Sequence, residues 1–126
     1  MYEQDYIMRL IKEMVRAVLK LLFHIDTETP TSELVEDAQA KEQAEELLRK
    51  LDSGRINEAE NKLYDLLENK TMENLLIGLL FYSHLNEMDQ EFLLANNYTK
   101  DEVKDGLEHL VSEFGLDGVT DAFTLE

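Results

Sequence analysis

Histidines and carboxylates are the residues whose types and spacing come nearest to a site for chemistry in this sequence. His84 and Glu87 are three residues apart and His109 and Glu113 are four apart, so each pair could share one face of a helix. A dinuclear carboxylate site in a helical bundle needs Glu-x-x-His segments, and no histidine here has a glutamate three residues before it. The sequence therefore predicts surface or hydrogen-bonded histidines and no metal site.

Other patterns that carry chemistry are absent from the sequence. The chain has no cysteine, which excludes a thiolate nucleophile or ligand and any disulfide. No serine lies in a Gly-x-Ser-x-Gly elbow, and the glycines are scattered singly instead of forming a phosphate-binding loop. The sequence predicts a protein without catalytic activity and without a cofactor.

The composition narrows the class of partner. Acidic residues number 28 and basic residues 12 in 126, giving a net charge of −16 and arguing against nucleic acid, which needs a basic surface. The 44% hydrophobic content favours a packed core. No run of 18 apolar residues and no signal peptide is found, so we expect a cytoplasmic protein without an integral membrane segment.

Residues 6–24 carry positive charge in this acidic chain. Basic side chains recur at intervals of three and four, which places them on one side of a helix, opposite a wide apolar side. Such a helix could face its own acidic chain, a second copy, a partner protein or a membrane surface. The candidate interaction surface comprises Arg9, Lys12, Arg16 and Lys20 with the flanking apolar residues Met8, Val15 and Leu19.

Helical periodicity predicts about six helices and an all-α fold. With one proline and five glycines, the sequence favours helices over a sandwich or barrel. We expect a single domain over residues 1–126, an antiparallel bundle packed around the long N-terminal amphipathic helix. The first predicted helix begins near Glu3 and ends near Phe23. The other predicted helices span Ser32–Asp52, Ile56–Glu68, Met72–His84, Asn86–Ala95 and the segment between Thr99 and Gly115.

Capping patterns mark several of these boundaries. Gly54 and Gly115 are expected to end helices in the left-handed conformation, and Thr71 to cap the apolar helix that follows it. Thr99 and Glu102 have the spacing of a capping box. After residue 116, a tail carries apolar residues able to pin it to the bundle: Val119, Ala122, Phe123 and Leu125.

The predicted hairpin in the middle of the chain resembles one tetratricopeptide unit. Its turn glycine and the packing positions of its second helix match those of the repeat, and no second copy follows at the repeat's period, so a single unit is expected. The matching residues are Gly54, Ile56, Ala59, Leu63, Leu66 and Leu67.

The chain as a whole resembles a family of small acidic bacterial proteins of unknown function, found mostly in Firmicutes. Two segments carry this resemblance, EQDYIMRLIKEMVRAVLKLLF at Glu3–Phe23 and FLLANNYTKDEVKDGLEHL at Phe92–Leu110. The resemblance implies an all-helical intracellular domain and assigns no activity, ligand or catalytic residue.

Two functions are therefore weighed. The first is a protein–protein interaction or self-associating scaffold module, possible as a homodimer, because a repeat-like hairpin and excess apolar helix surface suit binding. The alternative is a peripheral membrane protein that binds lipid through its basic N-terminal helix. The overall negative charge of the chain argues against this alternative, because anionic lipid would repel it.

Overall fold

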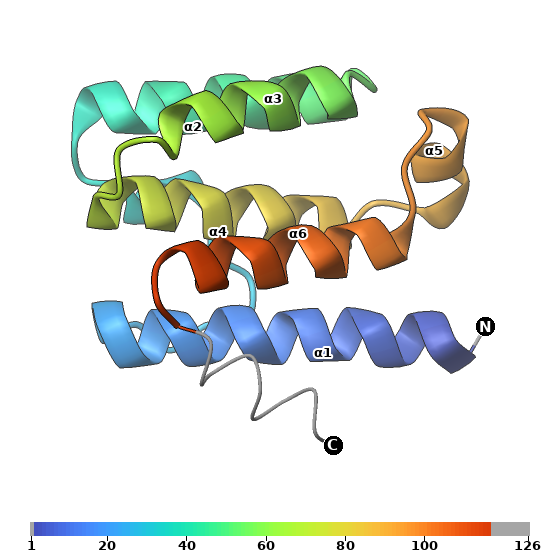
Figure 1. Ribbon diagram of the computed structural model, residues 1–126, viewed down its shortest axis with the longest axis horizontal. Helices are drawn as coiled ribbons and strands as arrows, with labels where there is room; N and C mark the ends of the chain where they lie inside the picture. Colours follow the sequence, from blue (N-terminus) through green and yellow to red (C-terminus); the bar gives the residue numbers. More distant parts are fainter. Residues whose placement is uncertain (1, 117–126) are drawn as a thin grey trace.

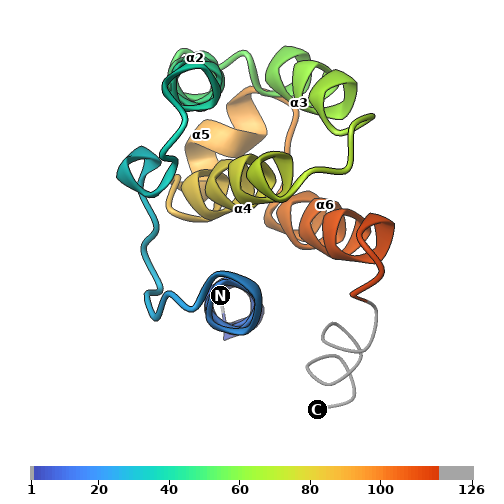
Figure 2. The same ribbon diagram turned by 90° about the vertical axis from the view of Figure 1, so that its left-hand side faces the viewer.

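The chain folds into a three-layered bundle of helices, and the all-α class is confirmed (Figures 1 and 2). The computed structural model describes the backbone of residues 2–116 and the side chains of residues 5–116. The elements are α1 (Tyr2–Val18), η1 (Leu19–Phe23), η2 (Ser32–Leu34), α2 (Ala38–Asp52), α3 (Ile56–Leu66), α4 (Met72–Asn86), α5 (Gln90–Ala95) and α6 (Lys100–Glu113). Helices α2 and α3 form one outer layer, α4 and α6 the middle, and α1 the other outer layer.

Helix α4 lies at the centre of the bundle. Residues 75–83 are all buried, which agrees with a sequence that is apolar on every side. Neighbours on several sides account for this burial, because α2, α6 and α1 all pack against α4. The expectation that the bundle packs around its N-terminal helix is therefore corrected: α1 covers one side, and α4 is the helix around which the others are arranged.

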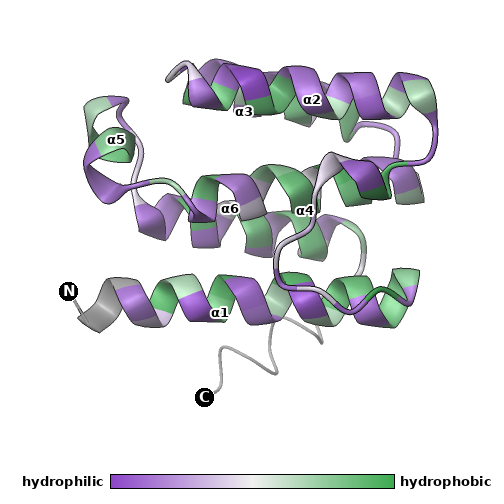
Figure 3. Cartoon of the chain, turned by 180° about the vertical axis from the view of Figure 1, so that it is seen from behind, coloured by the Kyte–Doolittle hydropathy of each residue, from purple (hydrophilic) through white to green (hydrophobic). Residues whose placement is uncertain are grey.

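Helix α1 buries one side only. Its inward residues contact α4 and α6, and its outward side is polar, as the alternating hydropathy of α1 shows in Figure 3. Burying an aliphatic side chain contributes about 2 kcal/mol, so six of them contribute as much as the whole stability of a typical domain. Helix α1 is thus an integral layer of the bundle. The six, counting Leu19 at the start of η1, are Leu10, Ile11, Met14, Val15, Val18 and Leu19.

The connection from α1 to α2 departs from the prediction. Helix α1 continues into the π-helical turn η1, and His24 follows in the left-handed conformation with φ 60°. The predicted start of the next helix at Ser32 is wrong, because residues 32–34 form only a 3₁₀ turn and Val35 is buried in an extended conformation. The helix begins at Ala38, where the Asp37 carboxylate accepts a hydrogen bond from Ala40 N at 2.9 Å.

Helices α2 and α3 form the predicted antiparallel hairpin. Gly54 ends α2 with φ +88°, and Arg55 N donates to Lys50 O at 2.9 Å, as expected of a Schellman turn. A Cβ at Gly54 would also meet the amide oxygen of Asn96 at 2.7 Å, so the loop after α5 packs on this turn. Only glycine satisfies both the dihedral angle and this close approach.

Helices α4 and α6 approach each other closely through two glycines. A Cβ at Gly106 on α6 would lie 2.4 Å from the ring of Tyr82 on α4. A Cβ at Gly78 on α4 would lie 2.8 Å from Leu110 on α6. Because each glycine and the large residue on its own helix are four positions apart, each helix offers one hollow and one projection to the other.

The ends of α4 and α6 are held by side chains. Burial lowers the pKa of Lys100, whose ammonium group donates to the carbonyls of Asn86 at 2.8 Å and Met88 at 2.7 Å and so closes the C-terminus of α4. Thr99 caps α6 as predicted, accepting from Glu102 N at 3.1 Å. At its other end, Leu116 N donates to Val111 O at 2.8 Å, which confirms the predicted Schellman turn at Gly115.

Two further boundaries differ from the sequence prediction. Helix α4 runs on to Asn86, so α5 is short and begins at Gln90, whereas a start at Asn86 was expected. The tail residues Val119, Ala122, Phe123 and Leu125 lie outside the described residues. None of the described helices is both long enough and apolar enough to span a bilayer.

Candidate functional site

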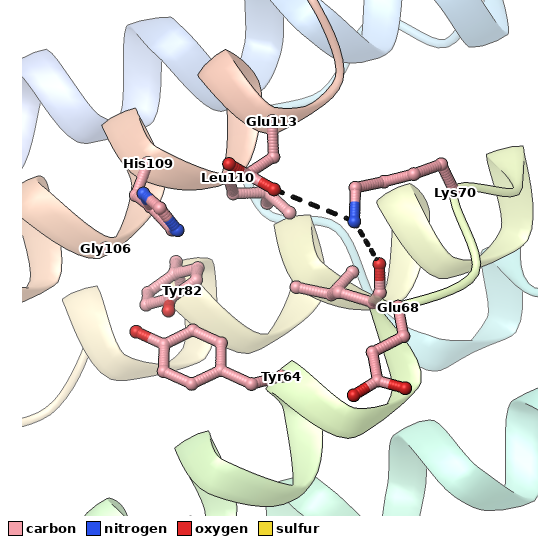
Figure 4. A pocket seen from close by; sticks show the side chains of 9 residues that line it. Tyr64, Glu68, Lys70, Tyr82, Gly106, His109, Leu110 and Glu113 are labelled. Carbon is pink, nitrogen blue, oxygen red and sulfur yellow. Dashed lines mark hydrogen bonds and ion pairs between the residues drawn. The ribbon is translucent and has the colours of Figure 1, made fainter.

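A hollow of about 200 Å³ opens between α3, α4 and α6, and we call it the tyrosine hollow (Figure 4). Aromatic rings lie on one side of it and a lysine on the other, with carboxylates at the edge. Its lining residues are Tyr64, Leu67, Glu68, Lys70, Tyr82, Gly106, His109, Leu110 and Glu113.

Helical spacing brings the side chains of the hollow together. Glu60 and Tyr64 lie one turn apart on α3, so both face the same way. His109 and Glu113 lie one turn apart on α6, on the side facing α3. Tyr82 projects from α4 between the two, into the space that the missing side chain of Gly106 leaves open.

The carboxylate of Glu60 joins three parts of the fold beside this hollow. Its Oε2 accepts hydrogen bonds from the hydroxyl of Tyr82 at 2.6 Å and from that of Tyr98 at 3.0 Å. Burial, and then the neighbouring Glu60 charge, raise the pKa of both tyrosines far above the usual value for a phenol. Both phenols therefore stay protonated at neutral pH and serve as donors that tie α4 and the α5–α6 loop to α3.

Tyr64 forms the more accessible aromatic wall. Its side chain is 43% exposed, and its ring meets the ring of His109 edge-on, with centroids 6.3 Å apart and an angle of 76° between the planes. Partial burial, and then the charge of Glu60, raise the pKa of the Tyr64 phenol. Part of this aromatic side chain is thus open to solvent on this side of the hollow.

Lys70 forms the opposite wall and is held in place by its neighbours. Its ammonium group donates to the carbonyl of Leu67, which the end of α3 leaves without a helical partner. The same group lies 3.7 Å from the carboxylate of Glu113 and 5.9 Å from the ring centroid of Phe114. Lys70 thus joins the C-terminal ends of α3 and α6 across the hollow.

The candidate surface on α1 is brought together only in part. Val15 and Leu19 are buried in the core, so the prediction that they belong to an interaction surface is wrong. They face inward because α6 covers, together with α4, a wider arc of α1 than a single neighbour would. Met8, Arg9 and Lys12 do share a shallow hollow on α1 with Asp5 and Tyr6.

Two of the four basic residues of α1 and η1 pair within the chain. Arg16 Nε lies 2.7 Å from Asp26 Oδ1, and this hydrogen bond lowers the pKa of the Asp26 carboxyl. Lys12 lies 3.5 Å from Glu87 at the end of α4. Arg9 and Lys20 are exposed. Much of the basic stripe therefore faces the protein's own acidic groups.

The histidines that were weighed as metal ligands lie apart in the fold. His84 Nε2 is 2.7 Å from Asp52 Oδ1, a contact that joins the ends of α4 and α2. His109 packs against Tyr64, and His24 ends the π-helical turn. Across residues 5–116, no group of three or more histidine, aspartate or glutamate side chains gathers in a way that could hold a metal ion.

The tyrosine hollow was not found from the sequence. One signal for it is present, because Glu60 and Tyr64 are four residues apart and share a face of α3 outside its apolar stripe. Nothing local indicates that Tyr82 and His109 join them, since that depends on how α4 and α6 cross. The pairing of Tyr82 with Gly106 is likewise a property of the tertiary structure.

These features define a compact, acidic, all-helical bundle with a small aromatic hollow. By sequence, the chain belongs to a family of unknown function, DUF6483, whose model matches residues 1–115. No curated protein and no solved structure matches the chain at a significant level. The predicted origin in Firmicutes and the resemblance of the α2–α3 hairpin to a tetratricopeptide unit stay predictions.

Proposed function

We propose that this protein is a protein-binding module without catalytic activity, and that its partner binds at the tyrosine hollow. The observation that carries the proposal is the hollow itself, where exposed aromatic surface, carboxylates and a fixed lysine lie together in a concave site. Aromatic residues are enriched where proteins bind one another, because they combine a large apolar area with polar groups. A hollow of this size suits one side chain of a partner.

We propose that the protein has no catalytic activity, because polar side chains in and near the hollow are already engaged in hydrogen bonds within the fold. The hydroxyls of Tyr82 and Tyr98 are already donated to Glu60, and their raised pKa values disfavour a phenolate. His84 is engaged with Asp52. These groups support the fold, which leaves recognition as the function that the site suits best. We further propose a cytoplasmic location, in keeping with the absence of cysteine.

Site-specific crosslinking in the native cell tests this function. A photoreactive residue in place of His109, which lines the hollow and is exposed, should capture a defined protein, whereas the same residue in place of the exposed Glu42 on α2 should not. The captured protein should then bind the purified wild-type chain in vitro. Capture at both positions alike, or at neither, would refute a partner at the hollow.

Self-association is a second form of the same function. The shallow hollow on α1, lined by Asp5, Tyr6, Met8, Arg9 and Lys12, favours it, because its two basic residues on one copy can meet the acidic surface of another. Light scattering after size-exclusion chromatography should then report a dimer whose mass falls at high salt. A monomer at high protein concentration would exclude the homodimer.

Association with a membrane is the weaker alternative. Helix α1 was expected to offer an apolar side to a bilayer, but that side packs against α4 and α6. Only the basic outward side would remain, and the net charge of −16 opposes contact with anionic lipid. Cosedimentation with anionic vesicles at low salt checks this alternative, and we expect the protein to stay in the supernatant.

A further inference from the structure

We propose that the tyrosine hollow accepts one cationic side chain, an arginine or a lysine presented by the partner protein. This inference rests on the proposed function and names the chemistry that the site would recognise. Three properties of the described residues point to a cation: the aromatic wall, the balance of charge around the hollow, and its size.

The aromatic wall offers the first reason. Tyr64 is 43% exposed, so part of its ring stays open to solvent beside the T-shaped contact with His109. The face of an aromatic ring carries a negative quadrupole that attracts ammonium and guanidinium groups. Arginine suits such a face especially well, because its planar guanidinium can stack on a ring while its N–H groups reach a carboxylate.

The balance of charge is the second reason. Glu68 and Glu113 line the hollow, with Lys70 as the single lysine or arginine among its lining residues. Lys70 is engaged with the Leu67 carbonyl and with Glu113, so it neutralises one of the two carboxylates. Glu68 follows Tyr64 by four residues, just past the end of α3, and its carboxylate points away from Lys70 (Figure 4). It forms no ion pair with another described residue.

The same contacts argue against an anionic ligand. A phosphate or carboxylate would need Lys70 to leave both the Leu67 carbonyl and Glu113, and it would then lie beside the charge of Glu68. A cation would not have to displace Lys70, and it could pair with Glu68, which has no ion-pair partner among the described residues. The acidic surface of the chain as a whole, with a net charge of −16, also favours the approach of a basic partner.

The size of the hollow limits what enters it. Pockets that bind drug-sized ligands span about 300–1,000 Å³. The volume of about 200 Å³ is smaller and matches the head of one side chain. The apolar residues Leu67 and Leu110 in the lining can contact the methylene groups of an arginine or lysine.

The test uses N-acetyl-arginine amide as the probe and follows backbone amide shifts of the full chain by NMR. Saturable shifts are expected around Tyr64, Glu68 and His109, with N-acetyl-lysine amide weaker and N-acetyl-glutamine amide without effect. Tyr64→Phe should keep the affinity, because the ring remains. Tyr64→Leu should weaken it about two- to fivefold, the factor expected of one exposed cation–π contact.

Glu68→Gln should weaken binding as well, whereas Glu42→Gln on α2 serves as the matched control and should not. Both glutamates are exposed, so neither change should unfold the chain. Shifts centred elsewhere, or equal shifts with the glutamine probe, would overturn the inference. If crosslinking from position 109 identifies a partner while the arginine probe fails, the proposed function stands and the cationic ligand is wrong.

Discussion

Helices α1 and α4 are similar in length and are built differently. Helix α1 alternates polar and apolar residues with a strong helical period, whereas α4 is apolar on every side. The difference follows from their surroundings, since α1 has neighbours on one side and α4 has them all round. Two helices of similar length thus have different roles, and the number of apolar faces indicates which one is central.

The strongest test of this difference is a charge at the centre of α4. Leu79→Asp should unfold the protein, because Leu79 is fully buried and an unpaired carboxylate there costs several kcal/mol, comparable with the whole stability of a small domain. Circular dichroism should show the loss of helical signal at 25 °C. Leu79→Met is the matched control and should cost less than about 1.5 kcal/mol.

A charge in α1 should have a large but smaller effect. Leu10→Asp places a carboxylate at a position that is 6% exposed, in a helix that can move away from α4 and α6 on its open side. We expect a clear fall in melting temperature, with the amides of α1 losing hydrogen-exchange protection before those of α4. An unchanged melting temperature would mean that α1 is a detachable arm. Arg9→Gln, at an exposed neighbour, should change little.

The contact of α4 with α6 provides a prediction of intermediate size. In an exposed helix interior Gly→Ala stabilises by about 0.5–1 kcal/mol. Gly106→Ala should instead destabilise by about 1–3 kcal/mol, because the new methyl group meets the ring of Tyr82. Urea denaturation measures the difference. Tyr82→Leu should restore part of the loss in the double variant, and Gly78→Ala should be milder because the end of Leu110 can rotate away.

The smallest effect concerns the polar contact of α4. Tyr82→Phe removes the donor to Glu60 and should cost about 1 kcal/mol at neutral pH. Because the folded state raises the pKa of Tyr82 and Tyr98, it holds protons that the unfolded chain releases near pH 10, so stability should fall as the pH rises past about 10. Urea denaturation at alkaline pH should show that the free energy of unfolding falls less steeply with pH for Tyr82→Phe than for the wild-type protein. An equal fall would mean that other groups dominate the alkaline transition.

Local features of the fold could be predicted from the sequence. The helical class, the hairpin around Gly54, and the caps at Thr71 and Thr99 are confirmed, because each depends on residues within a few positions of one another. The start of α2 was predicted wrongly because it does not depend on neighbouring residues alone. Ser32 resembles a cap locally, but burial of the extended Val35 against the core prevents a helix there, and that burial is a tertiary effect.

The candidate site depends on contacts between distant segments and could not be predicted. Tyr82 meets Glu60 across 22 positions, and Tyr98 meets it across 38. The α1 surface was predicted too broadly, since periodicity alone does not say how wide an arc the neighbours cover. Val15 and Leu19 lie within that arc and are core residues.

The two glycines between α4 and α6 have a consequence for how members of this family can differ. Gly106 is paired with Tyr82 and Gly78 with Leu110, so a larger residue at either glycine position calls for a smaller one opposite. In an alignment of relatives we therefore expect positions 78 and 110, and positions 82 and 106, to change together. Such covariation would indicate that α4 and α6 cross at the same place in those relatives, without the need to determine the structure of each one.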